Sequence, residues 1–234
     1  MTSLSSRARR LWIDDKAVAA VEFAMVVPFM LLLYVGGVEL GNGMAINVKV
    51  TATAHSVADM VSQNTQLTTA QMQNILGASA AILAPYATTG SSGNSLVTVT
   101  VSEISADTNG NLTLRWSQSY NGTSFGAGRT SLGANGVYAA VTLPPSLNGT
   151  AGNANNPNSQ NDNVSFIVGE ATYAYTPNLG YTVSGTVTLA DSFYVFPRCS
   201  TNSPANSGGP AYYDIKYPVA TNCTCIQHLQ QKTC

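Results

Sequence analysis

One short motif in the chain could place a nucleophile for hydrolysis. Gly122-Thr-Ser124-Phe-Gly126 matches the G-x-S-x-G pattern, in which a serine on a tight turn between a strand and a helix attacks an acyl group. Gly128 and Gly133 follow where that helix should begin, and the only downstream histidine, His228, lies among cysteines near the end of the chain. We therefore interpret the segment as a loop and expect no enzymatic activity.

Metal-binding and redox residues gather in the last 36 residues, which hold all four cysteines: Cys199, Cys223, Cys225 and Cys234. Outside the cytoplasm an even number of cysteines favours disulfides, and Cys223 and Cys225 are too close together to expect a bond between them. Each is expected to pair with Cys199 or Cys234. The alternative is a zinc site built from Cys223, Cys225, His228 and Cys234. Because the spacing fits no common zinc module, we expect disulfides and no cofactor.

A single carboxylate, Glu22, lies near the start of a 22-residue apolar run from Ala17 to Val38. As a helix this run is roughly 33 Å long, which matches a hydrocarbon core of about 30 Å. An ionised Glu inside such a helix costs about 2.5 to 3.5 kcal/mol at the bilayer centre unless it finds a partner. The position of Glu22 therefore indicates a function, although a protonated or snorkelling Glu22 is the simpler alternative.

The sequence around the apolar run predicts a retained, single-pass membrane helix. The run is longer than the 7 to 15 residues typical of a cleaved secretory signal, which is the alternative interpretation. Arg7, Arg9, Arg10 and Lys16 precede it, partly offset by two aspartates. This excess of positive charge predicts a cytoplasmic N-terminus in the bacterial inner membrane, with the rest of the chain periplasmic or extracellular.

Two blocks of sequence resemble the TadE/TadG-like pilus-assembly proteins of the bacterial Tad (Flp, tight-adherence) system. The first runs from Ala17-Val-Ala-Ala-Val-Glu22-Phe23-Ala through Pro28 to Gly36-Gly-Val-Glu-Leu-Gly41. The second comprises Glu170 to Gly180 and Leu189 to Arg198, which resemble the closing strands of that family. The resemblance implies a pseudopilin-like structural protein whose partners are other pilin-like and Tad assembly proteins.

The resemblance also implies a processing site and a register contact. Pseudopilins are cut by a prepilin peptidase so that Glu becomes the fifth mature residue, which places the cut between Ala17 and Val18. Ala17 departs from the usual Gly, and Phe23 departs from the Tyr of Flp pilins. After cleavage, the amine of Val18 could neutralise Glu22 of a neighbouring subunit and set the register of a helical assembly.

Periodicity predicts an α+β domain after the membrane helix. An apolar stripe from Ile46 to Val61 continues the first helix, with Gly41 and Gly43 as its expected bend or break, and Thr68 caps a second helix that Pro85 closes. Alternating residues 96–120 predict one antiparallel hairpin around an Asp107–Asn111 turn, and runs 164–175 and 181–196 predict another. Between them, Val137–Leu143 is expected to be a short helix or strand, and 144–163 a loop. The sequence thus predicts a long N-terminal helix, a second helix and a four-stranded antiparallel sheet.

Composition excludes some functions and sets the domain plan. Charged residues are only 9% of the chain and the net charge is −1, so nucleic-acid binding has no electrostatic basis.

We expect a basic leader (1–17), a transmembrane helix (18–40) and an exported domain (41–234). Together these features favour a membrane-anchored minor pilin-like component of Tad/Flp pilus assembly, acting in cell adhesion and in hetero-oligomers. The alternatives are a permanently tethered periplasmic binding or adhesive module and, third, a surface hydrolase using Ser124.

Overall fold

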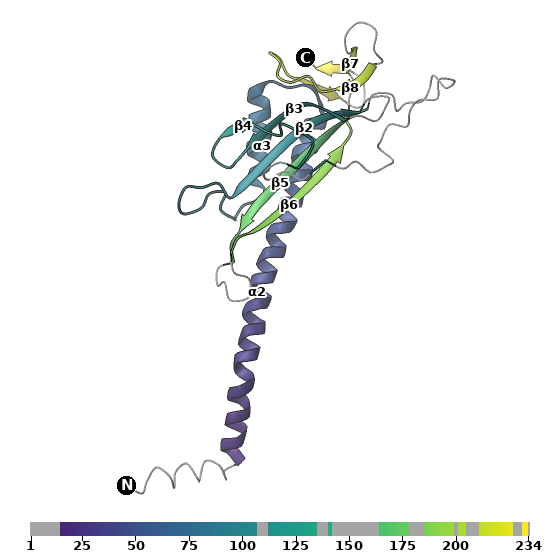
Figure 1. Ribbon diagram of the computed structural model, residues 1–234. Helices are drawn as coiled ribbons and strands as arrows, with labels where there is room; N and C mark the ends of the chain where they lie inside the picture. Colours follow the sequence, from purple (N-terminus) through teal and green to yellow (C-terminus); the bar gives the residue numbers. More distant parts are fainter. Residues whose placement is uncertain are drawn as a thin grey trace, which may run out of the picture. The chain divides into compact units, whose positions relative to one another are not determined.

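The structure is a computed structural model that describes residues 15–106, 112–134, 140–141, 164–177, 185–198, 201–204, 211–226 and 231–233 (Figure 1). Contacts divide the chain into two units: Met1–Ala45 with Thr176–Thr186, and Ile46–Tyr175 with Val187–Cys234. The basic leader before residue 15, the 107–111 turn and the 142–163 region lie outside the described residues. Of the expected element at Val137–Leu143, only residues 140 and 141 are described, and neither is in a helix or strand.

Helix α2 spans Asp15–Ser62, so 48 residues form one helix that contains the whole apolar run. It passes Pro28 without ending, although a proline removes one helical hydrogen bond. The expected break at Gly41 and Gly43 is wrong, because both glycines lie within the continuous helix. A glycine costs a helix only about 1 kcal/mol relative to alanine, which the helical hydrogen bonds and side-chain packing of the flanking turns can offset.

Helix α3 spans Thr69–Ala81 and starts as the sequence predicted. The Thr68 side chain accepts a hydrogen bond from the Gln71 backbone N–H at 3.2 Å, which satisfies one of the free donors of the first turn. Its buried residues recur at helical spacing: Met72, Ile75, Leu76, Ser79 and Ala80. The helix ends at Ala81, four residues before Pro85.

The main sheet has five antiparallel strands in the order β4-β3-β2-β5-β6. Their bounds are Val97–Ala106 (β2), Leu112–Tyr120 (β3), Phe125–Ala127 (β4), Val164–Tyr175 (β5) and Val187–Val195 (β6). Both predicted hairpins are present, and β2 pairs with β5 to join them into one sheet. The expected four strands were one too few, because β4 is a three-residue edge strand too short to show an alternating pattern.

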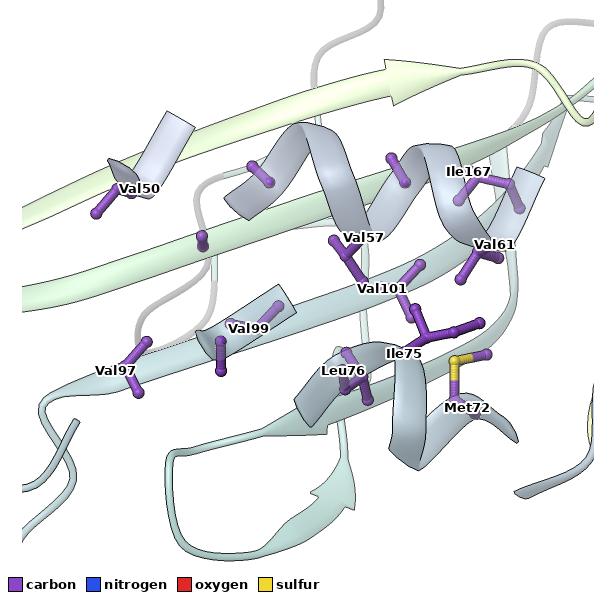
Figure 2. Close-up of a cluster of buried hydrophobic side chains, with 14 of the residues drawn as sticks. Val50, Val57, Val61, Met72, Ile75, Leu76, Val97, Val99, Val101 and Ile167 are labelled. Carbon is purple, nitrogen blue, oxygen red and sulfur yellow. The ribbon is translucent and has the colours of Figure 1, made fainter. Parts of the chain in front are cut away.

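The core lies between one face of this sheet and the two helices. Figure 2 shows side chains of α2 and α3 packed over the valines of β2 and Ile167 of β5. The predicted stripe of α2 is confirmed, since Ile46, Val50, Ala54, Val57 and Val61 are all at most 3% exposed. At Gly169 of β5, a Cβ atom would lie 2.3 Å from the Ala54 carbonyl oxygen. The absence of a side chain at Gly169 therefore lets α2 pack closely against the sheet.

The C-terminal segment belongs to the same packed domain. Strand β9 (Cys223–Ile226) pairs with β1 (Asn64–Gln66) and with β10 (Gln231–Thr233), while β7 (Thr201–Pro204) pairs with β8 (Ala211–Asp214). Before β9, the completely buried Ile215 is held from two sides. Its N–H donates to Glu103 Oε1 at 3.2 Å and its carbonyl accepts from Trp116 Nε1 at 2.9 Å. These two hydrogen bonds hold the C-terminal segment against β2 and β3.

Candidate functional site

The first half of α2 exposes apolar side chains on all sides. Every large hydrophobic residue named here is 48% to 72% exposed: Val18, Val21, Phe23, Met25, Val26, Phe29, Met30, Leu31, Leu32, Leu33 and Tyr34. Among the described residues, α2 is the one helix long and apolar enough to cross a membrane by length and composition. A helix with apolar side chains on every face suits a lipid environment, because in water all of these side chains would be exposed to solvent.

Glu22 lies within this apolar surface and is itself exposed. Helical geometry places Val18 one turn before it and Val26 one turn after it, so its carboxylate is flanked by exposed valines. Phe23, the next residue, is 69% exposed. Ala17 and Val18 lie in the first turn of α2, because the helix begins at Asp15. The proposed processing site and the carboxylate are therefore adjacent on one helix.

A second acid of α2, Glu39, is buried at 5% exposure. Sequence reasoning quoted Glu39 only as part of the family resemblance and assigned it no role. The available signal was its position at the end of the apolar run, where an acid is costly unless it is satisfied. Glu22 and Glu39 thus differ in environment, one exposed among apolar side chains and the other enclosed by protein.

Polar residues of the second half of α2 tie the helix to the domain, which the sequence did not reveal. Lys49, which lies off the apolar stripe, donates to the carbonyls of Ile82 at 3.1 Å and Ala84 at 2.6 Å. These carbonyls follow the end of α3, where a cation is favourable and α3 has no basic residue of its own.

A row of three contacts also joins α2 to β6 and the residues that follow it. Thr51 hydrogen-bonds Asp191, His55 stacks on Phe193, and Asp59 forms an ion pair with Arg198. The α2 residues are four apart, so they lie along one side of the helix. This row fixes the rotation of α2 about its own axis relative to the sheet.

A buried ion pair, also unforeseen from sequence, fixes the segment after β4 to the sheet. Arg129 Nε and Nη2 donate to Glu170 of β5 at 2.9 and 2.5 Å, and both residues are under 8% exposed. Arg129 Nη1 also donates to the carbonyls of Ser131 and Gly133, each at 3.4 Å. These contacts satisfy the guanidinium within the protein, as a buried charge requires. The pair therefore has a structural role.

The Ser124 motif forms a turn between two strands. The Asn121 Oδ1 accepts from the backbone N–H groups of Thr123 at 3.1 Å and Ser124 at 2.8 Å, and β4 starts at the next residue. A nucleophile elbow requires a helix after the serine, and a strand follows here. The interpretation of this segment as a plain loop was incomplete, since it forms a hydrogen-bonded turn and the start of β4.

Cys223 is 1% exposed on β9 and is disulfide-bonded. The side chains of Cys199, Cys225, His228 and Cys234 lie outside the described residues, so the pairing remains a prediction. Within the part of the chain that the structure describes, no three His, Cys, Asp or Glu residues gather as metal ligands would. Because a disulfide consumes its thiols, Cys223 cannot serve as a thiolate ligand in this state.

The fold and its apolar helix define a class: an α+β protein led by one helix of membrane-spanning length and composition. Residues 17–59 match the family model described as TadE-like protein. This segment of the chain is therefore similar to TadE-like proteins, as the sequence predicted. The match ends before the 170–198 block. No curated protein and no solved structure matches the chain.

Proposed function

We propose that this protein is a membrane-anchored minor pilin-like structural component of Tad pilus assembly. The observation that carries the proposal is the TadE-like match over 17–59, which coincides with α2 and includes Glu22 within its exposed apolar surface. A helix that exposes large apolar side chains on all faces requires lipid or other apolar helices around it. Its contribution would be assembly, with no catalysis.

The proposed topology follows from charge and length. Arg7, Arg9, Arg10 and Lys16 keep the N-terminus in the cytoplasm, α2 crosses the inner membrane, and the α+β domain lies in the periplasm or outside the cell. In an oxidising compartment a buried disulfide at Cys223 is stable. Both features agree with export of the domain behind a retained anchor.

Glu22 has the central role in the proposed assembly. Cleavage between Ala17 and Val18 would create an ammonium group four residues before the carboxylate, on the same exposed apolar helix. Within lipid, the amine of one subunit and Glu22 of its neighbour would relieve each other's desolvation cost. The two groups can meet only if the neighbouring helices are shifted along their axes by a defined distance. The pairing would therefore set the register between subunits.

N-terminal sequencing of the membrane-bound protein is the first test. A mature protein that begins at Val18 supports pseudopilin processing. An intact N-terminus at Met1, with no association with Tad components, would favour the alternative of a permanently tethered binding or adhesive module. A chain clipped just after the apolar run Ala17–Val38 and released as a soluble monomer would refute both.

The second test compares two helix variants for co-purification with other pilin-like and Tad proteins. Glu22→Gln removes the charge, whereas Met25→Gln introduces a similar amide at a 60% exposed position in the same helix. We expect Glu22→Gln to lose co-assembly and Met25→Gln to keep it. Equal co-assembly by both variants would remove the register role of Glu22.

A further inference from the structure

The connection between α2 and α3 is completed by a segment from the far end of the chain, which we call the strap: residues 215–224. The Leu67 N–H donates to the Lys216 carbonyl at 3.0 Å, and the Val219 N–H donates to the Leu67 carbonyl at 3.1 Å. The Lys216 N–H donates to the Thr65 carbonyl at 3.0 Å. The first half of the strap therefore pairs with one edge of the connection.

The second half of the strap covers the opposite edge of the same connection. Asn64 of β1 pairs with Thr224 of β9, and Gln66 pairs with Cys223. Successive residues of a strand direct their backbone hydrogen-bonding groups to opposite sides. The two halves of the strap therefore enclose β1 from both sides.

Few apolar contacts hold the strap in this position. Its buried hydrophobic residues are Ile215 and Cys223, at 0% and 1% exposure, whereas Lys216 and Pro218 are exposed. The paired strands β1 and β9 have only three and four residues. Backbone hydrogen bonds give little net stabilisation because water can replace them, and ordering of the strap costs conformational entropy. A stable closed strap therefore needs a further contribution.

The disulfide at Cys223 supplies that contribution. Its predicted partner, Cys199 or Cys234, lies outside the strap in the same C-terminal segment. A disulfide restricts the open chain more than the closed one, so it shifts the equilibrium toward closure. In the closed state Cys223 is 1% exposed, so a reducing thiolate reaches the bond only when the strap opens. Oxidation and closure therefore stabilise each other.

We propose that the strap is a redox-controlled closure of the domain, which is shut when Cys223 is oxidised and open when it is reduced. Oxidation transfers two electrons and two protons from the Cys223 thiol and its partner thiol to a disulfide donor, which leaves as a dithiol. Opening uncovers Leu67 and frees backbone N–H and carbonyl groups along both edges of β1, where an extended segment of another chain can pair. This closure requires an oxidising compartment, but neither the membrane span nor incorporation into a pilus.

Trypsin digestion of the full-length protein in detergent compares the two states. The Lys216 side chain is exposed, but its backbone N–H and carbonyl are both bonded to the α2–α3 connection, so cleavage after Lys216 requires an open strap. One sample is kept oxidised and the other is reduced with dithiothreitol and alkylated. We expect reduction to speed cleavage after Lys216 about tenfold or more. Arg115 is the control, because it is exposed in β3, which is paired on both sides, and its cleavage rate should not change.

A variant that loosens the strap without altering a cysteine tests the coupling in the reverse direction. The Asn222 side chain is exposed and accepts a hydrogen bond from the Thr68 N–H at 2.7 Å. Asn222→Ala should speed reduction of the disulfide by dithiothreitol about fivefold, measured by thiol labelling. Thr221→Ala, at the neighbouring exposed position, should leave the reduction rate unchanged.

Three outcomes would overturn the redox-controlled strap. Equal cleavage after Lys216 in oxidised and reduced samples would mean that the strap stays closed without the disulfide. Faster cleavage after both Lys216 and Arg115 would mean that the disulfide holds the whole domain. Four free thiols in the exported protein would remove the oxidised state, while the membrane anchor and the TadE-like match would stand. Equal reduction rates of Asn222→Ala and Thr221→Ala would likewise contradict reduction through an open strap.

Discussion

Substitution of Gly169 by alanine should separate helix α2 from the sheet. A Cβ at this position would lie 2.3 Å from the Ala54 carbonyl oxygen, 2.8 Å from Val57 Cγ1 and 2.9 Å from Ala58 Cβ. Contacts under 3.0 Å are essentially never seen, and the nearest atom belongs to the helix backbone. Rotation of a side chain therefore cannot relieve the clash, and α2 itself must move.

The size of that movement sets the energetic cost. To restore an ordinary contact of 3.4 Å, the helix backbone must move by about 1 Å from β5. A gap of 0.5 to 1 Å forfeits about a quarter to a half of the dispersion energy of each contact across it. Val50, Val57 and Val61 all lie in this layer with no exposed surface. We expect a loss of about 3 kcal/mol, the upper part of the usual range for overpacking.

Urea denaturation of the full-length protein in detergent measures this loss. The chain has two tryptophans, so a Trp12→Phe background leaves Trp116 as the fluorescent reporter. The Trp116 indole donates a hydrogen bond to the Ile215 carbonyl and therefore reports on the folded domain. Gly169→Ala should lower the urea midpoint by about 1 M or more. Gly126→Ala in β4 is the matched control, because its Cβ would meet nothing within 4 Å. A Gly169→Ala midpoint within error of the control would refute the close-packing argument.

Three further predictions concern polar groups in the domain. Lys49→Met should cost about 1 to 2 kcal/mol of unfolding free energy, because the carbonyls after α3 lose a cationic donor. Arg129→Met should cost about 3 to 5 kcal/mol by leaving Glu170 charged and buried, and the double variant Arg129→Met/Glu170→Met should recover most of this loss in a denaturation cycle. Burial, with a smaller contribution from Tyr86, raises the pKa of Tyr173 above its ordinary 10.0. The contribution of Tyr173 to the unfolding free energy should therefore be constant below about pH 10 and decrease above it, so the alkaline loss of stability should be less steep in Tyr173→Phe than in the wild type.

Matched controls make these predictions refutable. Lys216 is an exposed lysine, so Lys216→Met should change stability by less than about 0.5 kcal/mol, and an equal effect at Lys49 would contradict its capping role. The exposed pair Asp59–Arg198 should contribute less than about 1 kcal/mol, well below the buried pair. The sign for Tyr173 follows from linkage: between the two pKa values the folded state retains a proton that the unfolded state has lost. Identical alkaline profiles of wild type and Tyr173→Phe would refute that assignment.

Local patterns predicted the elements whose signal is contained in their own residues. The apolar stripe of α2, the Thr68 cap of α3 and the alternating strands of both hairpins each appear in the structure close to the expected residues. The stripe and the alternating strands repeat over several turns or residue pairs, and the cap is a short motif at the start of one helix, so each can be recognised without knowledge of neighbouring elements. The TadE-like segment was recognisable for the same reason, because it is continuous in sequence.

Other features depend on partners far away in the chain. β4 is defined by pairing with β3, and one sheet forms only because β2 pairs with β5, about 70 residues away. The contacts of Lys49 with the end of α3 and of Arg129 with Glu170 join residues 33 and 41 positions apart. The continuity of α2 through Gly41 and Gly43 was mispredicted because isolated glycines resemble breaks, although their cost is small.

The sequence by itself determined that α2 is apolar enough for a membrane, that Glu22 is an acid within it, and that an α+β domain follows, since composition and periodicity are properties of contiguous residues. Only the tertiary structure decided how closely the sheet approaches the predicted stripe of α2. A Cβ at Gly169 of β5 would lie 2.3 Å from the Ala54 carbonyl oxygen, so the close approach depends on a glycine more than 100 residues away in the chain. Such a contact joins residues that no local pattern relates, because packing depends on the side chains of both elements.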